Sequence, residues 1–175
     1  VPYEDQSNIG LYDTITLEND YYGLFRDNRY SGYDRIADAN QITFGLSTSF
    51  INQKGREKLR FAVGQNYYFE KSKVTLGDDD NNEEEVSRSS LISEFDINFE
   101  DNYFLHAGIE WDSNNEIIER ANTTVEKRWA NNTYLQASYR YYKESDDADW
   151  DEIVEQVGGK LNWSISSQWS AFASY

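Results

Sequence analysis

Cysteine and methionine are absent from the 175 residues, and there is one proline, Pro2, and one histidine, His106. Without cysteine there is no disulfide framework and no thiolate metal site, although this absence does not identify the cellular compartment. Because the only proline is Pro2, no later strand loses a backbone hydrogen bond to proline. No run approaches the roughly 18 consecutive apolar residues that a membrane-crossing helix needs. Basic residues are also scarce: 16 Lys and Arg against 32 Asp and Glu give a net charge of −16, which argues against a nucleic-acid partner.

Segments in which apolar and polar residues alternate fill the chain from Asn40 onward and predict eight antiparallel strands. The predicted strands are Asn40–Asn52, Lys58–Ser72, Ser89–Glu100, Asn102–Asp112, Ile117–Ala130, Asn132–Lys143, Val157–Ser166 and Gln168–Tyr175. Acidic loops are expected at 73–88 and 144–156, and residues 1–39 are expected to form a strand end and a long ordered loop. Tight turns at one end of the strands and longer loops at the other are typical of an outer-membrane β-barrel. The predicted fold of residues 1–175 is therefore all-β: an antiparallel transmembrane β-barrel wall of about eight strands, part of a larger barrel.

The alternation divides each predicted strand into an apolar and a polar face. The apolar residues expected to face lipid are Phe44, Phe61, Phe95, Leu105, Leu135 and Leu161. The charged residues expected to line a hydrated lumen are Arg60, Glu94, Asp96, Glu110 and Arg140. The 117–130 segment gives no clear lipid side, because Glu119 and Lys127 share a face with apolar residues.

A soluble β-sandwich or a lipocalin-like barrel also alternates in this way, so periodicity alone leaves that alternative open. Three observations favour the membrane barrel. Several predicted strands exceed the roughly 5–6 residues typical of globular proteins. Aromatic residues gather toward strand ends, as at 67–69, Trp111 and Trp129, where interfacial girdles would lie. The polar faces also carry charged residues, as the wall of a water-filled lumen would.

The segment before the first long strand contains an extended motif. It consists of Asp20-Tyr21-Tyr22-Gly23-Leu24-Phe25-Arg26-Asp27, Tyr30, Gly32, Asp34-Arg35-Ile36-Ala37 and Ala39-Asn40-Gln41, with flanking matches at Val1-Pro2-Tyr3 and Val63–Phe69. In these residues the chain resembles the LptD (OstA) family of LPS-assembly proteins. The resemblance is strongest over residues 1–70, and beyond them it rests mainly on the layout of the strands.

The resemblance implies an integral outer-membrane protein of a Gram-negative bacterium that inserts lipopolysaccharide (LPS) into the outer leaflet through a lateral opening in its barrel. It implies no cofactor and no covalent chemistry. The implied partners are LPS, the plug lipoprotein LptE, outer-membrane lipid, and the rest of the barrel with its periplasmic domain. Because the family's jellyroll and paired cysteines are not in this sequence, the chain is expected to be an internal stretch of barrel wall.

Residues 11–39 contain the candidate functional motif, which combines arginine with aromatic residues: Arg26, Arg29, Arg35, Tyr21, Phe25 and Tyr30. Arginine binds phosphate bidentately, so one interpretation is a structured loop at the barrel mouth that contacts LPS or the plug. In the alternative interpretation the same arginines hold the loop's own fold by pairing with Asp20, Asp27, Asp34 and Asp38, and the closeness of four aspartates favours it. Gly23 and Gly32 fit turn positions that need positive φ.

Two acidic runs, Asp78–Glu85 and Asp146–Glu152, suggest a divalent-cation site, but their spacing does not match an EF-hand loop and like-charge runs are usually solvated. No metal site is therefore predicted. His106 has no companion histidine, and the sequence contains no nucleophile, phosphate-loop or dinucleotide motif, so no catalytic residue and no enzymatic activity are predicted. Two other classes remain as alternatives: a general outer-membrane porin or diffusion channel, and a soluble carbohydrate-binding β-sandwich.

Overall fold

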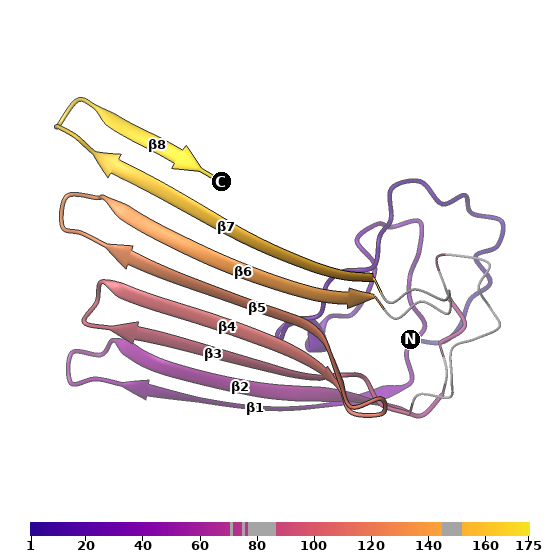
Figure 1. Ribbon diagram of the computed structural model, residues 1–175. Coiled ribbons are helices and arrows are strands. Elements are labelled where there is room, and N and C mark those ends of the chain that lie inside the picture. The colour runs from indigo at the N-terminus through magenta and orange to yellow at the C-terminus, as the bar shows by residue number, and fades with distance from the viewer. Residues whose placement is uncertain (71, 75, 77–86, 145–151) are drawn as a thin grey trace.

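The computed structural model describes residues 1–70, 72–74, 76, 87–144 and 152–175. Its main feature is one eight-stranded antiparallel sheet in which every strand pairs with the next strand in the sequence (Figure 1). The strands are β1 (Gln41–Ile51), β2 (Glu57–Tyr68), β3 (Leu91–Phe99), β4 (Tyr103–Asp112), β5 (Ile117–Arg128), β6 (Tyr134–Glu144), β7 (Glu152–Ser164) and β8 (Ser170–Ser174). One short 3-10 helix, η1 (Gly23–Phe25), precedes them. Across the described ranges, no helix has both the length and the apolar character needed to span a bilayer.

The predicted all-β, antiparallel architecture is confirmed, and all eight predicted strands are present. The residues that the structure describes form a single sheet, without the second packed sheet that a β-sandwich would require. The sheet is open, because β1 and β8 are its two edges and do not pair with each other. The two predicted acidic runs, at 78–85 and 146–152, fall almost entirely outside the described residues.

Most strand boundaries lie within two residues of the prediction, and two differ by more. β2 ends at Tyr68 and does not continue to Ser72, because Asp38 accepts hydrogen bonds from the backbone of Lys73 and Val74 and so holds this stretch in the loop. β7 begins at 152, so the predicted loop at 144–156 is too long. The early part of β7 escapes sequence reasoning because Glu155 lies on the otherwise apolar face and interrupts the alternation.

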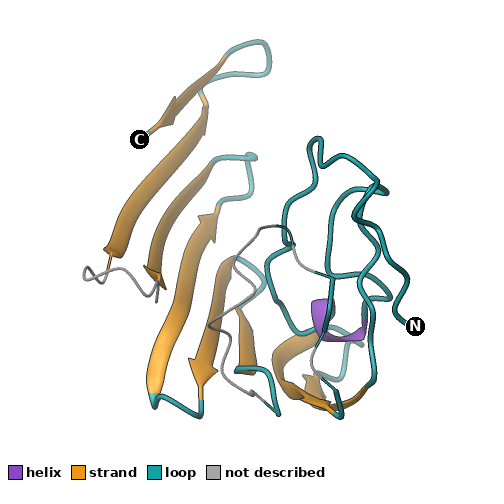
Figure 2. Ribbon diagram, turned by 90° about the vertical axis from the view of Figure 1, so that its right-hand side faces the viewer, coloured by secondary structure: helices purple, strands orange, loops and turns teal. Residues whose placement is uncertain are grey.

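The strand end expected within residues 1–39 is absent. This stretch has one isolated bridge, between Thr16 and Tyr30, and a backbone hydrogen bond from Ala39 N to Val1 O of 2.9 Å. Apart from η1 the rest forms irregular loops. Figure 2 shows these loops gathered on one side of the sheet, near β1 and β2 and away from β8.

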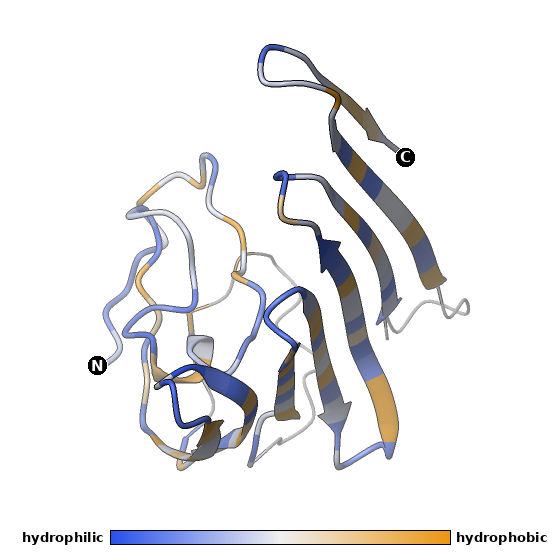
Figure 3. Cartoon of the chain, turned by 90° about the vertical axis from the view of Figure 1, so that its left-hand side faces the viewer, coloured by the Kyte–Doolittle hydropathy of each residue, from blue (hydrophilic) through white to orange (hydrophobic). Residues whose placement is uncertain are grey.

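The register separates the side chains into two faces, because residues directly opposite each other in antiparallel strands point to the same side. One cross-strand row reads Thr48, Phe61, Phe95, Ala107, Thr123, Tyr139 and Val157. The neighbouring row, on the opposite side, reads Ser49, Arg60, Asp96, His106, Thr124, Ser138 and Gly158. Figure 3 shows the result as alternating bands of hydrophobic and hydrophilic residues along the strands.

The residues that sequence analysis assigned to lipid and to lumen fall on opposite faces of this sheet. The face here called apolar carries Phe44, Phe61, Phe95, Leu105, Leu135 and Leu161. The face here called polar carries Arg60, Glu94, Asp96, Glu110 and Arg140. Each set thus shares one side of the sheet, although the sets come from different strands.

The ambiguous face of 117–130 has a structural explanation. The β4–β5 register shifts between Glu110 and Trp111, so that Glu110 pairs with Arg120 while Trp111 pairs with Ile118, and Glu119 is an extra bulged residue. Lys127 does lie on the apolar face, at the end of its strand, where its Nζ sits 3.3 Å from the centre of the Tyr103 ring. A long amphipathic side chain can reach water from such a position.

The packed core lies between residues 1–40, hereafter the N-terminal segment, and the polar face of the sheet. The buried apolar residues are Tyr21, Leu24, Tyr30, Ala37, Ala62, Val74 and Ile92. Four of them belong to the N-terminal segment, and Ala62 and Ile92 lie on the polar face of β2 and β3. The apolar face, by contrast, has no partner within the described residues: Phe44, Leu46 and Phe50 are 61, 68 and 67 % exposed.

Candidate functional site

The turn at Tyr21–Phe25, which includes η1, lies directly on the polar face of β1–β3. The backbone N–H of Tyr21 donates to Glu94 Oε1 at 2.9 Å, and Thr43 Oγ1 donates to the carbonyl of Leu24 at 3.2 Å. Leu24 is 2 % exposed, whereas Phe25 is 52 % exposed. The turn is therefore attached to the sheet by both hydrogen bonds and apolar contact.

Two glycines make this close approach possible. A Cβ on Gly64 of β2 would lie 2.6 Å from Leu24 Cδ1 and 2.9 Å from the carbonyl oxygen of Phe44. A Cβ on Gly45 of β1 would lie 2.6 Å from Phe25 Cζ. Such distances are shorter than real carbon contacts, so an alanine at either position would push the turn off the sheet. Glycine within a strand often marks such an approach.

An ionic cluster on the polar face lies next to the turn. Arg60 Nη1 is 3.2 Å from Glu94 Oε2 and 3.0 Å from Asp96 Oδ2. His106 Nδ1 is 2.7 Å from the other oxygen of Asp96. The Arg60 guanidinium also lies over the Tyr22 ring, 5.0 Å from its centre. Three of the predicted lumen residues are thus brought together, and the N-terminal segment contacts two of them, Arg60 and Glu94.

A second contact joins the N-terminal segment to β4. Asn19 Nδ2 donates to Glu110 Oε1 at 3.2 Å, and Arg120 Nε lies 3.6 Å from Glu110 Oε2. The Arg120 guanidinium in turn stacks on Tyr142, 4.7 Å from the ring centre. Arg140, the fifth predicted lumen residue, shares the polar face but is exposed and lies apart from these clusters.

The three arginines of the candidate motif form hydrogen bonds and an ion pair with other residues of the chain. Arg26 forms an ion pair with Asp20 at 3.2 Å and donates to the carbonyl of Glu18 at 2.8 Å. The remaining contacts are to carbonyls and a hydroxyl: from Arg29 to Ser72 Oγ and Val74 O, and from Arg35 to Ile9 O and Asp34 O. Most of their hydrogen bonds go to backbone carbonyl oxygens. These contacts agree with the interpretation in which the arginines hold the loop's own fold. That interpretation expected several ion pairs with aspartates, and one is present.

The motif's aromatic residues have two separate roles. Tyr21 and Phe25 pack edge to face on the turn, with ring centres 5.6 Å apart. Tyr30 is buried some distance away, where its hydroxyl donates to the carbonyl of Val74 at 2.7 Å. The six motif residues therefore form no single site: some hold the turn on the sheet and others hold residues 72–74.

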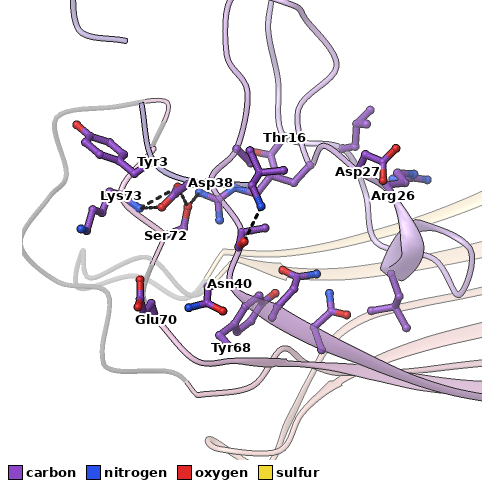
Figure 4. A pocket seen from close by; sticks show the side chains of 18 of the residues that line it. Tyr3, Thr16, Arg26, Asp27, Asp38, Asn40, Tyr68, Glu70, Ser72 and Lys73 are labelled. Carbon is purple, nitrogen blue, oxygen red and sulfur yellow. Dashed lines mark hydrogen bonds between the residues drawn. The ribbon is translucent and has the colours of Figure 1, made fainter. Parts of the chain in front are cut away.

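A cavity of about 470 Å³ lies between the N-terminal segment and the adjoining ends of β1 and β2 (Figure 4). Asn40, Gln41 and Tyr68 line it on the side of the sheet. Its charged side chains are three cations and three anions: Arg26, Arg29, Lys73, Asp27, Asp38 and Glu70. This balance gives the cavity no preference for an anion such as phosphate.

Asp38 is the anionic anchor beside this cavity. Its carboxylate accepts hydrogen bonds from Ser72 Oγ at 2.6 Å and from the backbone N–H of Lys73 at 3.0 Å (Figure 4). It also accepts one from the backbone N–H of Val74 at 3.0 Å. Burial by itself would raise the pKa of Asp38, but these three donors outweigh it and place the pKa below its ordinary value. The ionised carboxylate is therefore part of what holds residues 72–74 to the segment.

Comparison with known proteins gives the chain its family. The family described as LptD, LPS transport system D, matches residues 1–169. The chain belongs to the LptD family. The description is one of transport and does not name an enzymatic activity. The resemblance found in the sequence motif is thereby confirmed, and it extends far past residue 70.

Curated relatives carry the same name. The LPS-assembly protein LptD of Shewanella frigidimarina is 43 % identical over 168 residues, covering 95 % of this chain and 22 % of that protein. The LPS-assembly protein LptD of Vibrio cholerae serotype O1 is 38 % identical over 189 residues, covering 100 % of this chain and 24 % of that protein. The chain thus spans less than a quarter of the length of these LptD relatives.

Several residues of this LptD-family chain escaped sequence reasoning. Arg120 was missed because the bulge at Glu119 hides which way it points. Gly45 and Gly64 carried a signal, since glycine inside a predicted strand suggests close backbone approach, but the partner could not be named. The prediction of positive φ at Gly23 and Gly32 is wrong. At Gly23 space is the constraint, because a Cβ there would lie 2.7 Å from Asp20 Oδ1.

A charge cluster at the β3–β4 turn was also missed. Asp101 accepts hydrogen bonds from Arg56 and Lys58, which come from the neighbouring β1–β2 turn and the start of β2. The hydrogen bond from Lys58, together with the nearby Arg56 charge, lowers the pKa of Asp101. Within the described part of the chain, no group of three or more His, Cys, Asp or Glu is placed to hold a metal ion.

Proposed function

We propose that this chain forms part of the wall of an outer-membrane β-barrel that assembles LPS in a Gram-negative bacterium. Its apolar face would contact membrane lipid and its polar face would line a hydrated lumen. The observation that carries this proposal is the separation of the two faces. Within the described residues the apolar face is uncovered, while part of the polar face is covered by the chain's own N-terminal segment. A water-soluble protein with this sheet would expose a large contiguous apolar surface, which is unfavourable.

Strand length and strand pairing support the same proposal. Strands β1–β7 contain 9 to 13 residues, which matches the roughly 9–11 that a tilted strand needs to cross a bilayer. The outer edges of β1 and β8 have no neighbouring strand within the described residues. In a longer barrel, further strands would pair with both edges, in keeping with relatives about four times as long.

The position of the N-terminal segment suggests an orientation. It lies at the end of the sheet where β2 and β6 end, opposite the tight turns (Figure 1). The stretches of sequence between β2 and β3 and between β6 and β7 are longer than those turns. Long loops of outer-membrane barrels are extracellular and short turns are periplasmic. We therefore place the N-terminal segment in the outer part of the lumen.

LPS is the proposed substrate, and the proposed partners are the plug lipoprotein LptE, outer-membrane lipid and the rest of the barrel. The motif arginines already have partners within the chain. An anionic glycolipid passing through the lumen would instead meet the uncovered part of the polar face, where Arg140 is exposed. No covalent step is required of this chain.

Adjacent residues on β6 give a direct test, because Tyr139 and Arg140 point to opposite faces. A photo-crosslinking amino acid is placed at one or the other position in the full-length LptD protein, and newly made LPS is pulse-labelled in cells. At position 140 we expect an LPS adduct that appears early and disappears during the chase. At position 139 we expect adducts with resident membrane lipid, with no transient phase.

The alternatives give different results. Absence of any LPS adduct at 140, together with conductance of small solutes, would favour a general diffusion channel. Transient adducts at 139 and none at 140 would reverse the assignment of the faces. A full-length protein that stays soluble without detergent would support the carbohydrate-binding alternative.

A further inference from the structure

The N-terminal segment covers only part of the polar face. Its contacts with the sheet reach Thr43 and Gly45 on β1, Gly64 on β2, Glu94 on β3 and Glu110 on β4. The farthest is an ion pair of 3.9 Å between Glu18 and Arg120 of β5. Among the described residues, no side-chain contact joins the segment to the polar face of β6–β8, which includes Ser138 and Arg140. Figures 2 and 3 agree with this: the segment lies beside β1 and β2, whereas β8 lies at the opposite edge of the sheet.

The Tyr21–Phe25 turn packs closely against strands β1–β3, with complementary shapes on the two sides. Leu24 fills the space that Gly64 leaves open, and Phe25 and Tyr21 lie over Gly45. Glu94, itself held by Arg60, accepts the Tyr21 backbone N–H and so fixes the turn's position along the strand. Because a methyl group at either glycine would collide with the turn, the geometry depends on their having no side chain.

We propose that the Tyr21–Phe25 turn is a constriction fixed on one side of the barrel lumen, and that Gly45 and Gly64 are the positioning residues that hold it in place. The inference rests on the proposed function, since it requires the polar face to line a lumen. The turn then narrows the lumen beside β1–β4 and leaves the wall of β6–β8 as the open side. Passage through the barrel would follow this open side, past Arg140.

The test compares Gly64→Ala with Gly108→Ala in the full-length protein. Gly108 lies on the same polar face, but the group it would crowd is the Asn122 side chain and not the turn, so its replacement is the matched control. Two quantities are measured: ion conductance in planar bilayers, and the rate of trypsin cleavage after Arg26. For Gly64→Ala we expect a conductance increase of about twofold or more, because a displaced constriction widens the pore, together with faster cleavage. For Gly108→Ala we expect neither change.

Leu24→Ala keeps the proposal testable if Gly64→Ala does not assemble. It leaves the wall intact and removes the side chain that fits against Gly64, so it should raise both conductance and cleavage. Faster cleavage with unchanged conductance in either variant would show that the turn is attached to the wall without narrowing the lumen, and would overturn the proposal. Unchanged cleavage in both variants would show that the glycines do not position the turn.

The outcome is separable from that of the proposed function. If conductance and cleavage stay unchanged while position 140 still gives transient LPS adducts, the constriction is rejected and the LPS-assembly function stands. If position 140 gives no adducts while Gly64→Ala raises conductance, the constriction stands in a barrel that conducts small solutes.

Discussion

The backbone N–H of Tyr21 donates a hydrogen bond to Oε1 of Glu94, joining two residues 73 positions apart in the sequence. This bond connects an irregular loop to the middle of a strand and places the loop over a charged part of the sheet. Glu94 can serve this role because Arg60 holds its other oxygen at 3.2 Å. The stability of the loop's position and that of the ionic cluster are therefore linked.

Replacing Arg60 should destabilise the folded barrel. Arg60→Ala removes the only cation that pairs with Glu94 in the described part of the chain, and the Arg60 and Glu94 side chains are only 15 and 11 % exposed. Leaving such a carboxylate without its partner costs about 2–3 kcal/mol. Equilibrium unfolding in urea in the presence of lipid vesicles measures the change. Adding Glu94→Ala to Arg60→Ala should recover part of the loss, and strict additivity of the two changes would contradict this account.

A charge on the apolar face should be costly only if that face meets lipid. Phe95→Arg is expected to destabilise the barrel by roughly 2–4 kcal/mol near the bilayer midplane. Ser138→Arg, on the uncovered polar face of β6, serves as the control and should have little effect. Both are measured by the same vesicle unfolding assay. A neutral result for Phe95→Arg would overturn the assignment of the apolar face to lipid.

Asp38 should give the attachment of residues 72–74 a dependence on pH. Because the pKa of Asp38 is lower in the folded protein, its contribution is complete above the ordinary value of 3.8 and is lost as the pH falls through the folded value. At neutral pH, Asp38→Asn should speed hydrogen exchange at the amides of Lys73 and Val74. Asp13→Asn, on the same segment and without a hydrogen bond to these residues, should leave both rates unchanged. Equal rates in the two variants would argue against Asp38 as the anchor.

An alanine substitution should destabilise the protein only where the added methyl group meets the Tyr21–Phe25 turn. Gly159→Ala on β7 would cause no crowding, because the nearest atom to the added Cβ, Gln136 O, is 3.9 Å away. It is expected to be neutral, whereas Gly45→Ala should weaken the attachment of the turn, since its methyl group would meet Phe25 Cζ. Vesicle unfolding combined with trypsin cleavage after Arg26 distinguishes the two. Similar behaviour of both variants would mean that alanine disturbs strands here for reasons unrelated to the turn.

The strands and their faces were predictable because alternation is a local property with a period of two residues. It was enough to place Phe95 and Asp96 on opposite sides without any knowledge of their neighbours. It failed where one residue broke the period, at the bulged Glu119 and at Glu155 near the start of β7.

The covering of the polar face was not predictable, because it depends on contacts between distant parts of the chain. The motif from Asp20 to Asp27 predicted an ordered loop, but it gave no indication that Leu24 would pack against Gly64. The partners of the motif arginines were mispredicted for a related reason. Sequence offered nearby aspartates as their partners, while most of their hydrogen bonds go to backbone carbonyls, which have no signature in the sequence.

The strand order β1 to β8 has a consequence for the timing of folding. Each strand finds its partner in the next hairpin, so the sheet can grow by short-range steps along the chain. The N-terminal segment cannot form its contacts in this stepwise order. Its partners Glu94 and Glu110 belong to β3 and β4, which come much later in the sequence. The first part of the chain therefore cannot complete its contacts until β4 has joined the sheet, and up to that point this region of the polar face is not fully covered.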